Sequence, residues 1–60
     1  MEDIRLDLTS SQALALAQLV KRIKFTDLRA NAIDGDEAYV MQEAVAQIRL
    51  ALSENGFNPR

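Results

Sequence analysis

Residues 36–54 read Asp-Glu-Ala-Tyr-Val-Met-Gln-Glu-Ala-Val-Ala-Gln-Ile-Arg-Leu-Ala-Leu-Ser-Glu and form the longest periodic stretch of the chain. Their apolar residues recur at steps of three and four, which is the period of a helix that buries one face. We therefore predict a helix over about 36–54 and expect the other segments to pack around it. The face predicted to be buried consists of Ala38, Met41, Val45, Ile48 and Leu52.

A second, narrower apolar stripe lies on the opposite side of this predicted helix. Tyr39, Ala46 and Leu50 recur at i, i+7 and i+11, although one apolar face is enough to form a core. We expect the stripe to contact a partner, with Tyr39 and Leu50 as anchors, since aromatic residues are enriched among binding hot spots. The alternative is that the stripe covers a short helix of the same chain. The partner-binding candidates on this helix are Tyr39, Glu43, Ala46 and Leu50.

Residues 2–8 alternate between charged and apolar side chains. Strict alternation is typical of a half-buried β-strand, and no other stretch of the chain predicts a strand. A lone strand would leave its backbone groups unpaired. We therefore predict that the strand pairs between two chains; a loosely ordered N-terminal leader is the alternative. The outward residues of this strand, which are further partner-binding candidates, are Asp3, Arg5 and Asp7.

Capping residues predict where the helices begin and end. Thr9 and Gln12 have the spacing of a capping box, Thr26 is expected to cap a short second helix, and Asp34 or Asp36 the long one. The fold class predicted is mainly α, with one N-terminal β-strand at about 2–8 followed by helices at about 10–23, 27–33 and 36–54.

The end of the long helix carries a stop signal. Gly56 fits the position just after the helix, where a left-handed conformation is common, and Phe57 can then lie on Leu52. We predict a Schellman ending here.

Length and composition restrict the function. Sixty residues allow a single small domain, and a chain this short is marginally stable as a monomer. The absence of Cys and His removes disulfides, thiolate zinc sites and the commonest general base. We therefore expect no enzyme, no cofactor and no metal, and we expect association into a homodimer to supply the missing stability.

Charge and hydropathy restrict the partners. A net charge of −2 makes nucleic acid an unlikely ligand. No segment approaches the length of an apolar membrane span, and no basic-then-apolar start resembles a signal peptide. We therefore expect a cytoplasmic protein that does not bind membranes.

The opening of the chain resembles that of ribbon-helix-helix repressors. Ile4-Arg5-Leu6-Asp7-Leu8-Thr9, followed by a helix, carries this resemblance over about 4–33. It implies a dimeric DNA-binding transcriptional regulator whose strands enter the major groove. Two of the three outward strand residues are acidic and would repel phosphate. The cations available for this alternative are Arg5, Lys21, Arg22 and Lys24.

A second resemblance spans nearly the whole chain. The sequence is similar to a family of small bacterial proteins of unknown function, encoded on chromosomes and mobile elements, which implies a shared fold and transfers no catalytic residue. In size and acidity it also resembles phage and mobile-element inhibitors of host defence, including anti-CRISPR proteins. The runs that carry the family resemblance include Gln12-Ala13, Ala15-Leu16-Ala17-Gln18, Lys21-Arg22, Asp27-Leu28-Arg29, Glu37-Ala38-Tyr39 and Phe57-Asn58-Pro59-Arg60.

The expected function is therefore that of a non-enzymatic, acidic protein-interaction module. Its more specific form is an anti-CRISPR-like inhibitor that presents negative charge to a basic target in the host. The DNA-binding regulator is the alternative.

Overall fold

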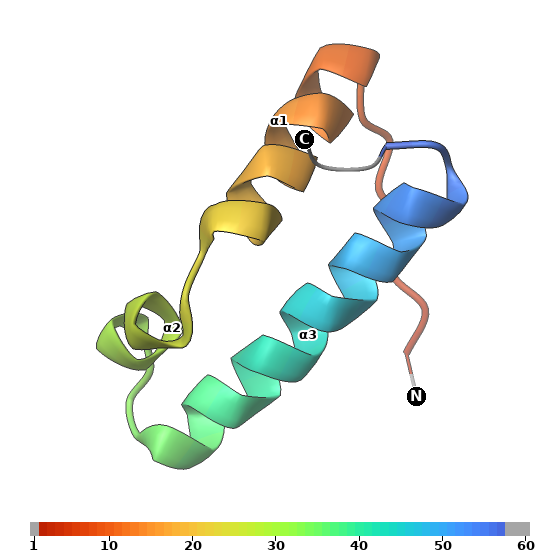
Figure 1. The fold of residues 1–60 in the computed structure, drawn as a ribbon. Helices are drawn as coiled ribbons and strands as arrows, with labels where there is room; N and C mark the ends of the chain where they lie inside the picture. Colours follow the sequence, from red (N-terminus) through yellow and green to blue (C-terminus); the bar gives the residue numbers. More distant parts are fainter. Residues whose placement is uncertain (1, 58–60) are drawn as a thin grey trace.

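The computed structural model describes residues 2–57 as three helices preceded by an extended segment (Figure 1). The long helix α3 packs against both α1 and α2, and within the described residues α1 and α2 do not pack on each other. The stretch at 36–54 therefore organises the fold, as predicted. Helices form where helices were predicted, with ends shifted by at most two residues: α1 spans Ser10–Arg22, α2 Phe25–Asn31 and α3 Gly35–Glu54.

The predicted caps of α1 and α3 are confirmed. The backbone N–H of Gln12 donates to Oγ1 of Thr9 at 3.1 Å, and the backbone N–H of Thr9 donates to Oε1 of Gln12 at 2.9 Å. At α3, the backbone N–H of Glu37 donates to Oδ1 of Asp34 at 2.9 Å. These bonds satisfy N–H groups that have no partner within the helix, so the sequence decides where both helices begin.

The predicted start of α2 is wrong. This helix begins at Phe25, before Thr26, because the carboxylate of Asp27 accepts the backbone N–H of Lys24 at 2.9 Å. The helix also ends earlier than predicted, so Ile33 lies in the following turn and is 87% exposed.

The predicted N-terminal β-strand is also wrong. Residues 2–8, which we call the arm, are extended but form no strand, and no strand occurs anywhere in the part of the chain that the structure describes. A strand needs a second extended segment that offers free N–H and C=O groups. Helices use these groups internally, and the rest of the described chain is mostly helical. The pairing of strands between chains that we predicted therefore has no basis.

The C-terminal stop of α3 is confirmed as a Schellman motif. Gly56 has a φ of 85°, its N–H donates to the carbonyl of Ser53 at 3.0 Å, and the N–H of Phe57 donates to the carbonyl of Leu52 at 2.8 Å. The ring of Phe57 packs against the core cluster that contains Leu52. This ending turns the chain back so that Phe57 closes one end of the core.

Two alanine substitutions test how much the positive φ of Gly56 matters for stability. Gly56→Ala should lower the free energy of unfolding by about 1–2 kcal/mol and the melting temperature by about 5–10 °C, since a side chain disfavours the left-handed region. Gly35→Ala is the matched control, because a Cβ at either glycine meets open space and only Gly56 has a positive φ. We expect Gly35→Ala to be neutral or slightly stabilising. Equal losses in thermal melts followed by circular dichroism would contradict this account.

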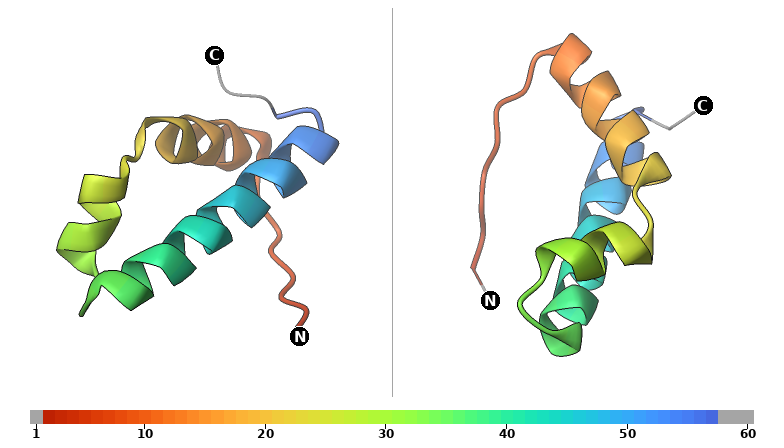
Figure 2. Two further views of the ribbon diagram at one scale, coloured as in Figure 1. Left: turned by 60° about the horizontal axis from the view of Figure 1, so that its bottom comes forward. Right: turned by 90° about the vertical axis from the view of Figure 1, so that its left-hand side faces the viewer.

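The core is small and rich in alanine. No large side chain is completely buried, so packing of the core removes little apolar area from water. The smallest dimension of the molecule is 15 Å, little more than the diameter of one helix. Figure 2 shows the helices with only the arm outside them. The buried residues are Ala13, Ala17, Val20, Leu28, Ala38 and Leu52.

Arg49 ties α3 to the end of α1. Its Nε donates to the carbonyl oxygen of Val20 at 2.9 Å, and Nη2 donates to the same oxygen. The last carbonyls of a helix have no partner within the helix, and a cation there also interacts favourably with the helix dipole. The spacing of apolar residues places Arg49 off the buried face but does not reveal this long-range contact.

Replacing Arg49 tests the strength of this connection. Arg49→Gln should lower the free energy of unfolding by about 1–2 kcal/mol and the melting temperature by about 5–10 °C, because the half-buried carbonyl loses its charge-assisted partner. Arg29→Gln, at an exposed position of α2, should change stability by less than about 0.5 kcal/mol. If urea titrations gave equal midpoints for the two variants, the connection would be of no energetic importance.

Candidate protein interaction site

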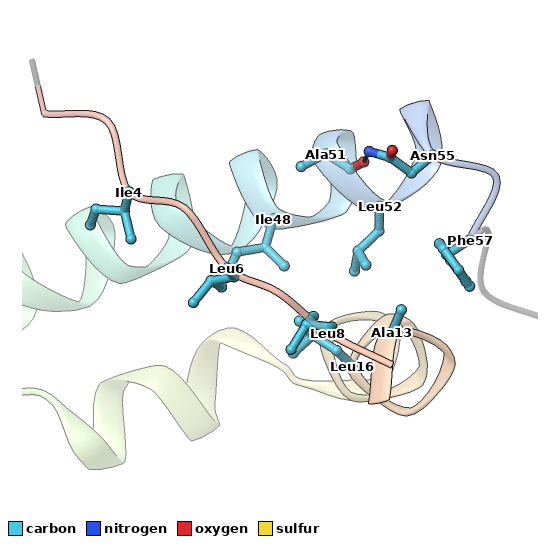
Figure 3. A pocket seen from close by; sticks show the side chains of 10 residues that line it. All are labelled: Ile4, Leu6, Leu8, Ala13, Leu16, Ile48, Ala51, Leu52, Asn55 and Phe57. Atoms are coloured by element: carbon cyan, nitrogen blue, oxygen red, sulfur yellow. Dashed lines mark hydrogen bonds between the residues drawn. The ribbon is translucent and has the colours of Figure 1, made fainter. Parts of the chain in front are cut away.

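An apolar groove lies between the arm and the α1–α3 pair. Its volume is about 360 Å³, and Figure 3 shows its walls, with the arm on one side and helical side chains on the other. Among residues 2–57, no charged residue lines it, and the only polar side chain in its walls is that of Asn55, which donates to the carbonyl of Ala51 at 2.8 Å. We call it the arm groove; it is lined by Ile4, Leu6, Leu8, Ala13, Leu16, Ile48, Ala51, Leu52, Asn55 and Phe57.

The arm lies over the groove without filling it. Exposure rises along the arm away from α1, from 43% at Leu8 through 69% at Leu6 to 83% at Ile4. Among the described residues, no backbone hydrogen bond joins the arm to a helix. Three apolar side chains are thus directed toward an apolar groove, yet they remain largely in contact with water.

The apolar surface continues from the groove along α1. Leu8 and Leu16 also line a second, shallower hollow, together with Gln12, Ala15 and Leu19. Leu19 is 57% exposed, which is unusual for a leucine beside other apolar side chains. Contiguous exposed apolar surface of this kind marks interaction sites in proteins.

The charged residues of the arm do not line the groove. Arg5 and Asp7 lie 3.7 Å apart, measured from Nε to Oδ1, and their side chains are 90% and 87% exposed. Asp3 is exposed as well. The three arm residues predicted to bind a partner therefore form the polar side of the arm, and its apolar side carries the site.

The stripe on α3 lies away from the arm groove, and none of its residues lines the groove. The rings of Tyr39 and Phe25 are 5.1 Å apart between centroids and inclined by 44°, so Tyr39 covers part of α2, while 60% of it remains exposed. Leu50 is 54% exposed, and Ala46 and Glu43 are exposed. Tyr39 thus contacts the short helix of the same chain, whereas Leu50 faces solvent, and its contact with a partner stays a prediction.

The sequence contained the signal for the arm groove, but we assigned it to a strand. The alternation at 2–8 correctly places Ile4, Leu6 and Leu8 on one side of the arm. What periodicity could not show is that helices face this side. Nor could it show that Asn55 and Phe57, which lie on either side of Gly56 in the Schellman motif, complete the wall.

Within residues 2–57, no three Asp or Glu side chains come together in a way that could hold a metal ion. Over the same residues, no helix has both the length and the apolar character needed to cross a bilayer.

Comparison with protein families identifies the relatives of the chain. The model of DUF7706, a family of unknown function, matches residues 1–60. The chain belongs to this family. The predicted resemblance to a small family of unknown function is therefore confirmed over the whole chain. Searches of curated proteins and of solved structures gave no match.

Proposed function

We propose that the chain is a non-enzymatic protein-interaction module that binds through the arm groove and works as a homodimer. The observation that carries this proposal is the uncovered apolar groove on a molecule only 15 Å thick. A second polypeptide on this face would cover the groove. It would also remove Leu6 and Ile4 from water.

The small core favours a permanent association over a transient one. Only six residues among those described are buried apolar side chains, and three of these are alanines, so the chain gains little from folding alone. If the chain is stable only in association, its partner must be present whenever the chain is synthesised. A second copy of the same chain meets this requirement, which favours a homodimer.

The non-enzymatic part of the proposal rests on the side chains available. The sequence contains no His and no Cys, and its Asp and Glu residues lie mainly at helix starts and on the outer side of the arm. Asp34 and Asp27 accept backbone N–H groups there. None of these groups lines the arm groove, so the groove offers no acid or base.

Two more specific functions remain predictions. An anti-CRISPR-like inhibitor would use the exposed acidic residues to bind a basic host protein, and capture from host lysate at low salt would test this. A DNA-binding regulator would give a mobility shift that weakens steeply with salt.

Molar mass in solution tests the proposed function. Light scattering behind a sizing column, at several loading concentrations, should give twice the chain mass of 6.7 kDa, and this dimer should persist on dilution. A folded species of 6.7 kDa at every concentration would contradict the homodimer. Circular dichroism of the same fractions would show whether that species is helical.

A further inference from the structure

We infer that the two copies exchange their arms, so that the arm of each lies in the groove between α1 and α3 of the other. This inference rests on the proposed function, because it specifies how the arm groove is filled. The contacts are side-chain contacts in an apolar groove and require no pairing of strands.

The exposed area of the chain matches what a dimer needs. The chain exposes 5116 Å², whereas a folded monomer of 6.7 kDa is expected to expose about 3,900 Å². The surplus of about 1,200 Å² exceeds the roughly 800 Å² that each partner buries in an interface of standard size. The radius of gyration agrees, at 12.2 Å compared with about 10 Å for a compact chain of this length.

The course of the arm favours exchange over closure onto its own helices. Leu8 is held near the groove because it directly precedes Thr9, which caps α1. Beyond Leu8 the arm diverges, and exposure reaches 83% at Ile4; Figure 2 shows this end of the arm standing away from the helices. The outer apolar side chains are therefore available to a second molecule, while the helical wall of the groove remains open.

The arm itself has the chemistry of an occupant for this groove. Its apolar side chains alternate, so that they fall on one side about 7 Å apart. Its charged side carries the exposed Arg5–Asp7 pair. In an exchanged dimer the apolar side enters a groove without charges, and the charged side stays in water. Each copy receives the arm of the copy to which it gives its own, and this reciprocity closes the assembly at two chains.

Engineered cysteines test the exchange directly, since the natural chain has none. Ile4→Cys and Ala51→Cys would be placed on separate chains, because both positions line the groove. After equal amounts of the two variants are unfolded, refolded together and oxidised, about half of the protein should form a disulfide between them, since random pairing puts half of the chains in mixed dimers. Arg5→Cys with Ala51→Cys is the control, because Arg5 lies on the other side of the arm, and it should cross-link far less. Leu6→Cys with Ile48→Cys provides a second pair.

The possible outcomes test the arm exchange and the homodimer separately. The double variant, with both cysteines on one chain, shows whether an arm reaches its own groove. Disulfides formed only within single chains, or no disulfide above the control level with either pair, would overturn the exchange. Light scattering on the unmodified protein tests the homodimer separately: a dimer without cross-linking refutes the exchange alone, and a folded monomer refutes both.

Discussion

Replacing Leu6 with serine should convert the dimer into monomers. Leu6 is 69% exposed in the single chain and becomes buried when the arm groove is filled. Burial of a leucine contributes about 1.5–3 kcal/mol, and a symmetric dimer loses this contribution twice. The dissociation constant should therefore rise about 10²–10⁴-fold, as measured by sedimentation equilibrium over a range of concentrations.

Asp7→Ser is the matched control for this substitution. It places the same side chain at the next position of the arm, on the side that carries the exposed Arg5–Asp7 pair. We expect a change in the dissociation constant of less than about threefold, since exposed ion pairs contribute little. If Leu6→Ser and Asp7→Ser weakened association equally, the apolar side of the arm would not be the contact surface.

Filling the contact between α2 and α3 should have the largest effect on stability. Ala38 is 0% exposed, and it lies near the start of α3. Ala38→Leu would force extra methyl groups into a closed space, which costs about 2–3 kcal/mol. In a chain of this size the melting temperature should fall by about 10–20 °C, measured by circular dichroism at fixed protein concentration.

Ala46→Leu makes the same change at an exposed position about two turns further along the same helix. Ala46 is exposed, so leucine at this position displaces nothing and helix propensity barely changes. We expect its melting temperature to stay within a few degrees of the unmodified protein. A large loss with Ala46→Leu, or none with Ala38→Leu, would show that α3 is packed differently from the account given above.

Local rules predicted the helices well because their signals lie close together in the sequence. The capping box of Thr9 and Gln12, the cap at Asp34 and the Schellman ending at Gly56 each need only a few adjacent residues. The start of α2 was missed because two capping residues compete within three positions. The carboxylate of Asp27 accepts the backbone N–H of Lys24, so the helix begins at Phe25, before Thr26.

The long-range features could not be read from local patterns. The alternation in the arm gave the correct side for its apolar residues but the wrong structure, because a strand depends on a neighbour elsewhere in the chain. The contact of Arg49 with Val20 joins residues 29 positions apart, and a charged residue on a helix surface gives no sign of it. The pairing of Tyr39 with Phe25 depends likewise on how α2 folds back onto α3.

The central claim is that folding and association are linked, and the dependence of the melting temperature on protein concentration tests it most directly. For a homodimer that dissociates as it unfolds, the melting temperature rises with concentration. For two chains of this size the rise should be about 6 °C for each tenfold increase. Circular dichroism in cuvettes of different path length covers the required range. A reversible transition whose midpoint is the same at every concentration would contradict the account.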